Sequence, residues 1–324
     1  MVLNGVASDW MDVLSGVPQG SVLGPILFAI FINDIDAFML SLDTFLNKFA
    51  DDTKIGQPVG SPEGVVRLQK ALDNIVTWSE DWQMQFHIDK CKVLHCGHNN
   101  PRSDYLMHGN SLEHISEQKD LGVIIHNSLK PSLQCAAAAK KANQVRGQIV
   151  RSFSFRSRDI ITRLYKCYVR PHLEYAVQAW SPWTAKDIDL LESVQKRAVR
   201  MISGLSGSYE EKLHQIGLLS LSQRRQRGDL IETYKILKGF SDVQPSTWFK
   251  PAERENGSQT RQSSSPFSLL VPKSKLDVRK NSFSHRVIGP WNNLPDSVRQ
   301  ADSVNMFKNK LDAYMFHHTV LVTA

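Results

Sequence analysis

The sequence predicts an α+β fold: a small antiparallel sheet backed by helices, followed by a helical region and a helical tail. Two patterns indicate this order. Residues 1–129 contain short apolar segments that alternate like strands, whereas apolar residues recur with helical spacing from Pro131 onward. The third observation is composition: 41% hydrophobic and 22% charged residues are typical of a globular protein. A length of 324 residues suits one large domain or two or three ordinary ones.

Charge is distributed unevenly along the chain, whose formal net charge is +7. Residues 1–129 carry 8 Lys and Arg against 16 Asp and Glu, and residues 130–240 carry 20 against 9. Residues 241–324 carry 11 against 7. An acidic first part and a basic middle fit a metal site beside a nucleic-acid-binding surface. The alternative is that the helices simply carry Lys and Arg on solvated faces.

Targeting and membrane signals are not found in the sequence. No apolar run reaches the ~18–20 residues of a membrane-spanning helix, and the first residues lack the basic region of a signal peptide. The four cysteines are too few and too scattered for a disulfide framework. We therefore expect an intracellular protein, nuclear or cytoplasmic.

A loop containing Gly and Pro precedes an apolar segment near the N-terminus. Its residues are Gly16-Val17-Pro18-Gln19-Gly20-Ser21. Glycine and proline at this spacing predict a loop whose backbone can come close to a ligand. Pro25 suits the first turn of a helix, and the apolar run after it predicts a helix over residues 25–36 that is buried on most sides.

Two adjacent aspartates follow the next predicted strand. Phe45 to Ala50 reads as a strand, and Asp51-Asp52 reads as the turn of a hairpin that returns through Ile55. Neighbouring carboxylates repel each other, so they must be exposed to water or share a cation. In most proteins such a pair is only a solvated turn.

The loop at 16–21 followed by Phe49-Ala50-Asp51-Asp52 resembles motifs B and C of reverse transcriptases, which are RNA-directed DNA polymerases. The class it resembles most is that of non-LTR (LINE-type, jockey-like) retrotransposons. The resemblance implies that Asp51 and Asp52 are catalytic carboxylates that bind Mg²⁺ or Mn²⁺. It implies a third carboxylate from an upstream strand, motif A. It also implies that Pro18, Gln19 and Gly20 line the nucleotide and template side.

The segment after the hairpin extends the resemblance. Ser61 is a good N-cap with Pro62 at the first helical position, which predicts a helix over 62–82 packed on the back of the sheet. Residues 82–92 resemble motif D, where a basic residue approaches the incoming triphosphate. Lys90 or Lys92 would take that role, although a lysine on a solvated strand is an equal alternative. A predicted strand at 121–125 resembles the primer-grip region at the palm–thumb junction.

Cysteines and histidines gather between residues 87 and 98, which raises a zinc site as an alternative. They are His87, Cys91, His95, Cys96 and His98. Strand-like alternation over this segment places Cys96 on the side opposite Cys91 and His95, and no Cys-x-x-Cys pair is present. Packing of the thiols in the core is therefore the favoured interpretation.

A basic helical region is predicted from Lys130. Its helices are expected to start at Pro131 and to continue over 160–169, 172–179, 187–202, 209–216 and 221–237. This block resembles the thumb of LINE-type elements and the region after it. The predicted nucleic-acid-binding residues are Lys140, Lys141, Lys196, Arg197, Arg200, Arg224, Arg225 and Arg227. Trp180 and Trp183 could stack on bases, but anchoring in the core or a loop is the favoured role.

Four parts are expected. They are a partial palm (1–129, motif B to the primer grip), a thumb-like region (130–240), a flexible linker (241–282) and a C-terminal helical tail (283–324) that resembles the natural end of such proteins. The fingers and motif A have no counterpart in the sequence, since Asp9, Asp12 and Asp34 do not lie where motif A would.

We therefore expect a truncated reverse transcriptase with little or no activity alone. The alternatives are a non-enzymatic nucleic-acid-binding remnant and a decaying reading frame. The resemblance implies RNA template, DNA primer or product, and deoxynucleoside triphosphates as partners. It implies no membrane, and protein partners stay undefined.

Overall fold

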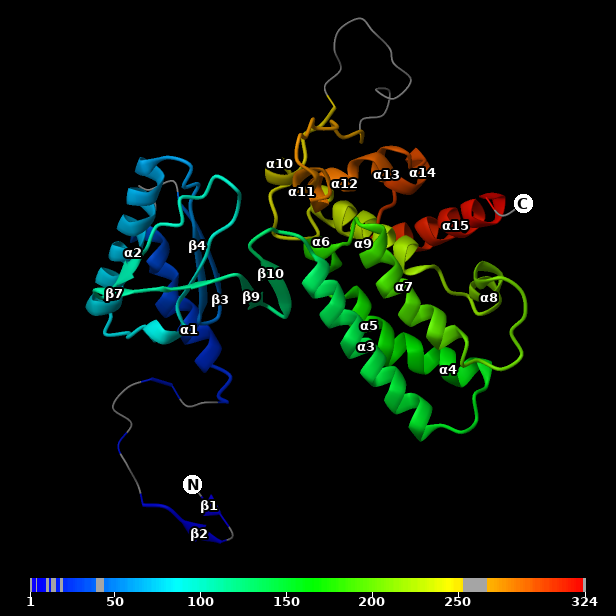
Figure 1. The fold of residues 1–324 in the computed structure, drawn as a ribbon, viewed down its shortest axis with the longest axis horizontal. Helices are drawn as coiled ribbons and strands as arrows, with labels where there is room; N and C mark the ends of the chain where they lie inside the picture. Colours follow the sequence, from blue (N-terminus) through cyan, green and yellow to red (C-terminus); the bar gives the residue numbers. More distant parts are fainter. Residues whose placement is uncertain are drawn as a thin grey trace, which may run out of the picture. The chain divides into compact units, whose positions relative to one another are not determined.

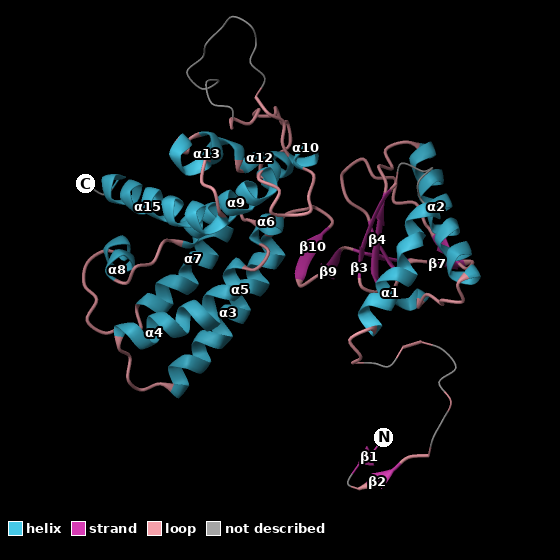
Figure 2. Cartoon of the chain, turned by 180° about the vertical axis from the view of Figure 1, so that it is seen from behind, coloured by secondary structure: helices cyan, strands magenta, loops and turns pink. Residues whose placement is uncertain are grey.

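The computed structural model describes residues 2–3, 5–9, 12, 16–17, 20–38, 44–252 and 267–322. The chain divides into two compact units, Met1–Ser116 and Glu117–Ala324, which are described here one at a time. Figure 1 shows the elements of each unit in chain order, and Figure 2 shows the same chain from behind.

The first unit combines two longer helices with short strands. Its helices are α1 (Gly24–Ile32), the 3₁₀ segments η1 (Asn33–Phe38) and η2 (Ile88–Lys90), and α2 (Pro62–Asp81). Its strands are β1 (Val2–Leu3), β2 (Val6–Ala7), β3 (Phe45–Phe49), β4 (Asp52–Gly56), β5 (Lys92–Leu94), β6 (Leu106–Met107), β7 (Asn110–Ser111) and β8 (Glu113–Ile115). The predicted hairpin at 45–55 and the predicted helix at 62–82 are confirmed.

The described strands pair two by two rather than forming one antiparallel sheet, which corrects the prediction. The pairs β1–β2, β3–β4 and β6–β7 are antiparallel, whereas β5 and β8 run parallel. A parallel pair needs a long crossover connection. Residues 95–112 supply it, and the small β6–β7 hairpin lies within that connection.

The core of the first unit forms where α2 packs against η1 and the end of α1. Trp78 is fully buried, and its ring meets that of Phe31 edge to face with centroids 6.0 Å apart. The Trp78 indole Nε1 donates to Asp34 Oδ1 at 2.9 Å, which satisfies its one polar group. Ser61 caps α2 by accepting from the backbone N–H of Gly64 at 3.4 Å, as its place before Pro62 predicts.

The first helix is less buried than predicted. It changes to 3₁₀ geometry at Asn33, and Ile26, Leu27 and Ile30 are 54%, 48% and 68% exposed. All side chains of Gly24–Ile32 are apolar. Only the part of the helix that carries Phe28, Phe31 and Ile32 packs against the core of the unit. An all-apolar sequence therefore indicates what a helix can bury, and the surrounding elements decide how much of it is buried.

The second unit opens with a hairpin of β9 (Glu117–Asp120) and β10 (Val123–His126). Leu121 and Gly122 form its turn with φ of +43° and +85°, so the strand predicted at 121–125 starts two residues later than expected. Tyr175 stabilises this turn, since its hydroxyl donates to the Leu121 carbonyl at 3.0 Å. A Cβ on Gly122 would lie 3.3 Å from the Tyr175 ring, so glycine suits both the positive φ and the close approach.

Helices form the rest of the second unit. The first group is α3 (Ser132–Ser152), α4 (Arg158–Leu164), the π-helical η3 (Tyr165–Val169), α5 (Arg170–Glu174), α6 (Val177–Trp180), α7 (Ala185–Val199), α8 (Tyr209–Gln215) and α9 (Leu221–Leu237). The second group is α10 (Pro245–Trp248), α11 (Asp277–Lys280), α12 (Phe283–Arg286), α13 (Ile288–Asn292), α14 (Asp296–Arg299) and α15 (Val304–Val322).

Pro171, between the predicted helices 160–169 and 172–179, is expected to break or kink the helix, and the structure forms a π turn there. The Arg170 N–H donates to the carbonyl of Tyr165, five residues back, and the chain continues as α5 with Pro171 in its first turn.

Two apolar clusters hold the second unit together. The first lies among α3, α5 and α7 and includes Cys135, Leu173 and Leu191. The second joins α9 to the C-terminal helices, where the rings of Tyr234 and Phe307 stack with centroids 4.2 Å apart. Residues 253–266 of the predicted linker lie outside the described residues. On either side of that gap, Phe249 and Leu269 are buried in this second cluster.

Candidate functional site

The two aspartates lie at the tip of the β3–β4 hairpin. Phe49 pairs with Asp52, so Ala50 and Asp51 form a two-residue turn. Ala50 takes a left-handed conformation with φ of +50°, which costs a non-glycine residue about 1 kcal/mol. Both carboxylates are exposed, and no Lys or Arg in the described part of the chain forms an ion pair with either. Two exposed carboxylates are thus carried by consecutive residues at the tip of the hairpin.

Lys48 fixes the hairpin to the end of α1. Its Nζ donates to the carbonyls of Ile32 and Asn33, both at 3.1 Å, and forms an ion pair with Asp36 at 3.0 Å. A cation at a helix C-terminus satisfies free carbonyls and interacts favourably with the helix dipole. Helix α1 and the β3–β4 hairpin are therefore joined through one side chain.

The predicted nucleotide-binding loop is described only in part. Pro18 and Gln19 lie outside the described residues. Gly20 has φ of +83°, a conformation that favours glycine. Ser21 Oγ accepts from the Gly24 N–H at 2.9 Å and so holds the start of α1.

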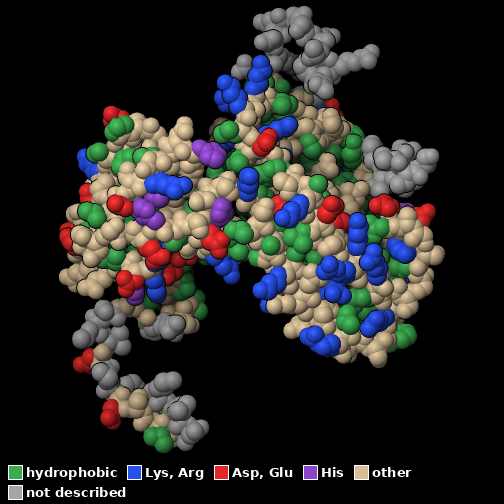
Figure 3. Space-filling model, in the orientation of Figure 1, with side chains coloured by type: hydrophobic (Ala, Val, Ile, Leu, Met, Phe, Trp, Pro, Cys, Tyr) green, Lys and Arg blue, Asp and Glu red, His purple; other side chains and the backbone are tan. Residues whose placement is uncertain are grey.

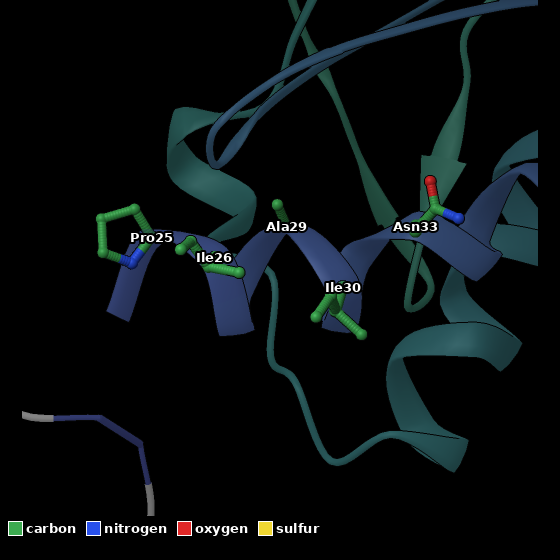
Figure 4. A pocket seen from close by; sticks show the side chains of 5 residues that line it. All are labelled: Pro25, Ile26, Ala29, Ile30 and Asn33. Atoms are coloured by element: carbon green, nitrogen blue, oxygen red, sulfur yellow. The ribbon is translucent and has the colours of Figure 1, made fainter. Parts of the chain in front are cut away.

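An open hollow of about 500 Å³ lies along α1, directly after this loop. Figure 4 shows the side chains that line it, which are Pro25, Ile26, Ala29, Ile30 and Asn33.

No described hydrogen bond or ion pair joins Lys90, or the acidic residues Asp34 and Asp36, to the aspartate pair. Lys90 is exposed at the end of η2. Asp34 is held by Trp78 and Asp36 by Lys48. Among the residues that the structure describes, no group of three or more His, Cys, Asp and Glu could hold one metal ion. This holds equally for the His and Cys side chains between residues 87 and 98.

The predicted phosphate-binding residues fall into two sets. In α9, Arg224 forms a two-pronged ion pair with Glu174, both contacts at 2.8 Å, and this hydrogen bonding raises the pKa of Arg224. Arg227 binds Asp312 in the same way. Arg225 is only 4% exposed. The cations of α9 therefore hold the unit together, and Arg225 does not occupy the surface position that the prediction assumed.

The other five predicted cations are exposed. They are Lys140, Lys141, Lys196, Arg197 and Arg200. Figure 3 shows Lys and Arg side chains gathered over the part of the second unit that holds α3, α4 and α7. Lys196 lies over the Tyr209 ring at 5.3 Å, and Arg197 Nη1 donates to Asn143 Oδ1 at 3.5 Å.

Arg146 on α3, which was not among the predicted nucleic-acid-binding residues, lies half-buried beside the exposed cations of α3 and α7. Its Nε donates to the same Asn143 oxygen that Arg197 reaches, at 3.3 Å. The spacing of Asn143 and Arg146 on one helix was visible in the sequence. The approach of α7 to α3, more than fifty residues later in the chain, was not visible in the sequence.

Trp180 is buried, and its indole N–H donates to the Tyr175 carbonyl at 2.7 Å, as expected of a residue that anchors the core.

Comparisons with known proteins find a family match in the first part of the chain. Residues 2–142 match the family model described as reverse transcriptase (RNA-dependent DNA polymerase). This range contains the loop at 16–21, α1, the β3–β4 hairpin and the first half of α3. The chain is related to the reverse transcriptases of jockey-like, non-LTR elements. The recognition made from motifs B and C is thereby confirmed.

The chain is similar to polymerases of several mobile elements. The chain is 28% identical over 213 residues to the RNA-directed DNA polymerase from mobile element jockey of Drosophila funebris, and 25% identical over 214 residues to that of Drosophila melanogaster. It is 26% identical over 203 residues to the probable RNA-directed DNA polymerase from transposon BS of Drosophila melanogaster.

The matches with the two jockey polymerases each cover 62% of this chain and 23% of the relative, and the match with the BS polymerase covers 58% and 22%. The chain thus spans about a quarter of the length of these relatives. No solved structure matches the chain. Within the described residues, no helix is long and apolar enough to cross a membrane.

Proposed function

We propose that this chain carries part of the catalytic palm of an RNA-directed DNA polymerase, with Asp51 and Asp52 as ligands of divalent metal ions. The observation that carries the proposal is the fixed pair of exposed carboxylates at the tip of the β3–β4 hairpin. Carboxylate oxygens are the ligands that Mg²⁺ and Mn²⁺ prefer. The family match over residues 2–142 gives this pair its chemical context.

Each residue has an assigned role in the proposal. Asp51 in the turn binds metal directly, and Asp52 at the start of β4 supports the second metal position. Divalent ions held by Asp51 and Asp52 would activate the primer hydroxyl and neutralise charge on the transferred phosphoryl group. Gln19 and Gly20 position the nucleotide, and Lys90 approaches its triphosphate. The substrates are deoxynucleoside triphosphates, an RNA template and a DNA primer.

We further propose that these 324 residues by themselves do not polymerise DNA at an appreciable rate. Mg²⁺ takes about six oxygen ligands, and a bridging third carboxylate is part of the family's site. The described residues offer Asp51 and Asp52 without a third acid beside them. The site is therefore half of a metal centre, able to bind a cation weakly and in need of another carboxylate for turnover.

Nucleic-acid binding without catalysis is the second candidate function. The exposed cations on α3 and α7 favour it, since they have no carboxylate partner among the described residues. A surface of this kind contacts phosphates without reading sequence. The thumb-like assignment of residues 130–240 is part of this proposal, with α9 contributing stability instead of phosphate contacts.

A manganese titration tests the metal proposal. Binding of Mn²⁺ is measured by electron paramagnetic resonance on the wild type, on Asp51→Asn and on Asp52→Asn. We expect Asp51→Asn to abolish binding and Asp52→Asn to weaken it. Asp104→Asn, which removes an exposed carboxylate elsewhere in the first unit, is the matched control and should bind as the wild type does. Equal affinity in the wild type and Asp51→Asn would show that the assignment is wrong.

A further inference from the structure

The C-terminal part of α3 is basic. The helix contains Lys140, Lys141, Arg146 and Arg151, and its 21 residues include no Asp or Glu. A hollow of about 430 Å³ runs along its outward face, lined among others by Lys141, Gln144, Gln148 and Arg151. Cations and amides lining a hollow can each donate a hydrogen bond to an anionic chain.

Two guanidinium groups converge beside this face. Arg146 Nε and Arg197 Nη1 both donate to Asn143 Oδ1, at 3.3 and 3.5 Å. Burial is the main cause that lowers the pKa of Arg146, and repulsion from the nearby Arg197 adds to it. Neither forms an ion pair with a carboxylate in the described part of the chain. A phosphate placed between them would relieve that repulsion and accept from both.

An exposed aromatic ring lies at the end of the same helix. Phe155, in the loop between α3 and α4, is 72% exposed. Arg151 and Arg158 flank it in the sequence. The loop is held at its next residue, because the Arg156 carbonyl accepts from the Ser203 N–H at 3.2 Å. A ring presented this way among cations suits stacking on an unpaired base.

Gly147 gives a further indication. It lies in the interior of α3, where glycine is less stable than alanine. A Cβ at this position would meet only the Arg151 Nη1 atom, at 3.7 Å, so the fold itself does not require glycine here. Glycine on an exposed helix allows the backbone of a ligand to come close.

We propose that the outward face of α3 and the loop after it bind single-stranded nucleic acid. The Arg146–Arg197 pair takes one backbone phosphate, Lys141 and Arg151 take others across Gly147, and Phe155 stacks on an unpaired base. The inference rests on the nucleic-acid binding proposed above and names its strand state and its contact residues. RNA and DNA single strands offer the same phosphates and bases, so the experiment includes both.

The first test uses the complete chain and measures fluorescence anisotropy of labelled uridine and thymidine oligomers and of a duplex of equal length. Phe155→Ala is expected to weaken single-strand binding by roughly 5- to 100-fold. Phe155→Leu should match it, whereas Phe155→Trp should keep wild-type affinity because it restores an aromatic face. Leu276→Ala, which removes another exposed apolar side chain of the second unit, is the control.

The second test addresses the phosphates and the glycine. The Arg197 side chain is exposed. Arg197→Gln should reduce the slope of log affinity against log salt concentration by about 0.7, the value for one lost phosphate contact on a single strand. Lys275→Gln, also exposed in the second unit, is the charge-matched control and should leave the slope unchanged. Gly147→Ala should raise the melting temperature and weaken binding together, a combination that a purely structural role would not give.

The outcomes distinguish this inference from the more general proposal that the chain binds nucleic acid. Salt-dependent binding that is unaffected by Phe155→Ala and Arg197→Gln would overturn the inference and leave nucleic-acid binding in place elsewhere. Duplex bound more tightly than single strand, with no effect of Phe155→Ala, would also overturn the inference. If the wild type binds no oligomer at low salt, nucleic-acid binding fails along with the inference.

Discussion

Lys48 shows how one side chain connects two successive elements, the end of α1 and the β3–β4 hairpin. Replacing it with methionine keeps most of the apolar stem and removes the contacts to the Ile32 and Asn33 carbonyls and to Asp36. We expect Lys48→Met to lower the free energy of unfolding by about 1–2 kcal/mol, measured by urea denaturation. Lys70→Met on α2, where the lysine is exposed, is the control. A loss equal to that of the control would show that Lys48 does not fix the hairpin.

His95 makes the first unit sensitive to acid. Its Nδ1 pairs with Asn100 Oδ1 at 3.0 Å, and its Nε2 is buried without a partner. Burial first, and then the neighbouring His114 and Arg102, lower the pKa of His95, whereas Asn100 and Asp104 act in the opposite direction. The unfolded chain, with a histidine pKa of about 6.5, therefore takes up the proton before the folded chain does.

Stability of this unit should accordingly be constant above about pH 7 and fall as the pH drops below about 6.5. Urea midpoints measured between these values and about pH 5.5 check the prediction, since carboxylates titrate below that range. His95→Gln should flatten the dependence, and His98→Gln, in the exposed turn nearby, should not. An unchanged slope in His95→Gln would assign the acid sensitivity to other groups.

At the scale of elements, α1 leaves large apolar side chains exposed, among them Ile26 and Ile30. Its side chains on the uncovered face are only loosely packed, so their replacement should cost little stability. We expect the double variant Ile26→Gln, Ile30→Gln to bind less hydrophobic dye and to aggregate less than the wild type, at a similar urea midpoint. Size-exclusion chromatography and dye fluorescence measure the effect. Wild-type protein that is monomeric and binds no dye would contradict it.

Local patterns predicted elements well where the deciding contacts are close in sequence. Ser61 and Pro62 gave the start of α2, and the alternation before Asp51 gave the β3–β4 hairpin. The prediction that α1 is buried on most sides was wrong. Burial of a helix depends on the elements that cover it, and the residues of the helix alone do not determine those. Pro171 indicated an interruption, but its form as a π turn depends on how η3 packs.

At the scale of the molecule, charge counts predicted a basic surface but not which cations form it. Arg224 and Arg227 look in the sequence like Lys140 and Lys141, yet they pair with Glu174 and Asp312 from distant segments. Pairing across fifty or more residues has no local signal. The basic surface of the second unit is therefore narrower than the sequence indicated, and lies on α3 and α7.

The central claim is that divalent metal binds at the hairpin tip, and cleavage by bound iron tests it most directly. Fe²⁺ occupies sites that prefer oxygen ligands, and radicals formed there cut the nearby backbone. We predict that the intact chain, incubated with Fe²⁺, ascorbate and peroxide, is cut within a few residues of Asp51. Excess Mg²⁺ should suppress the cut, and Asp51→Asn should remove it. Cleavage confined to other segments, or a cut at the hairpin that persists in Asp51→Asn, would contradict the account.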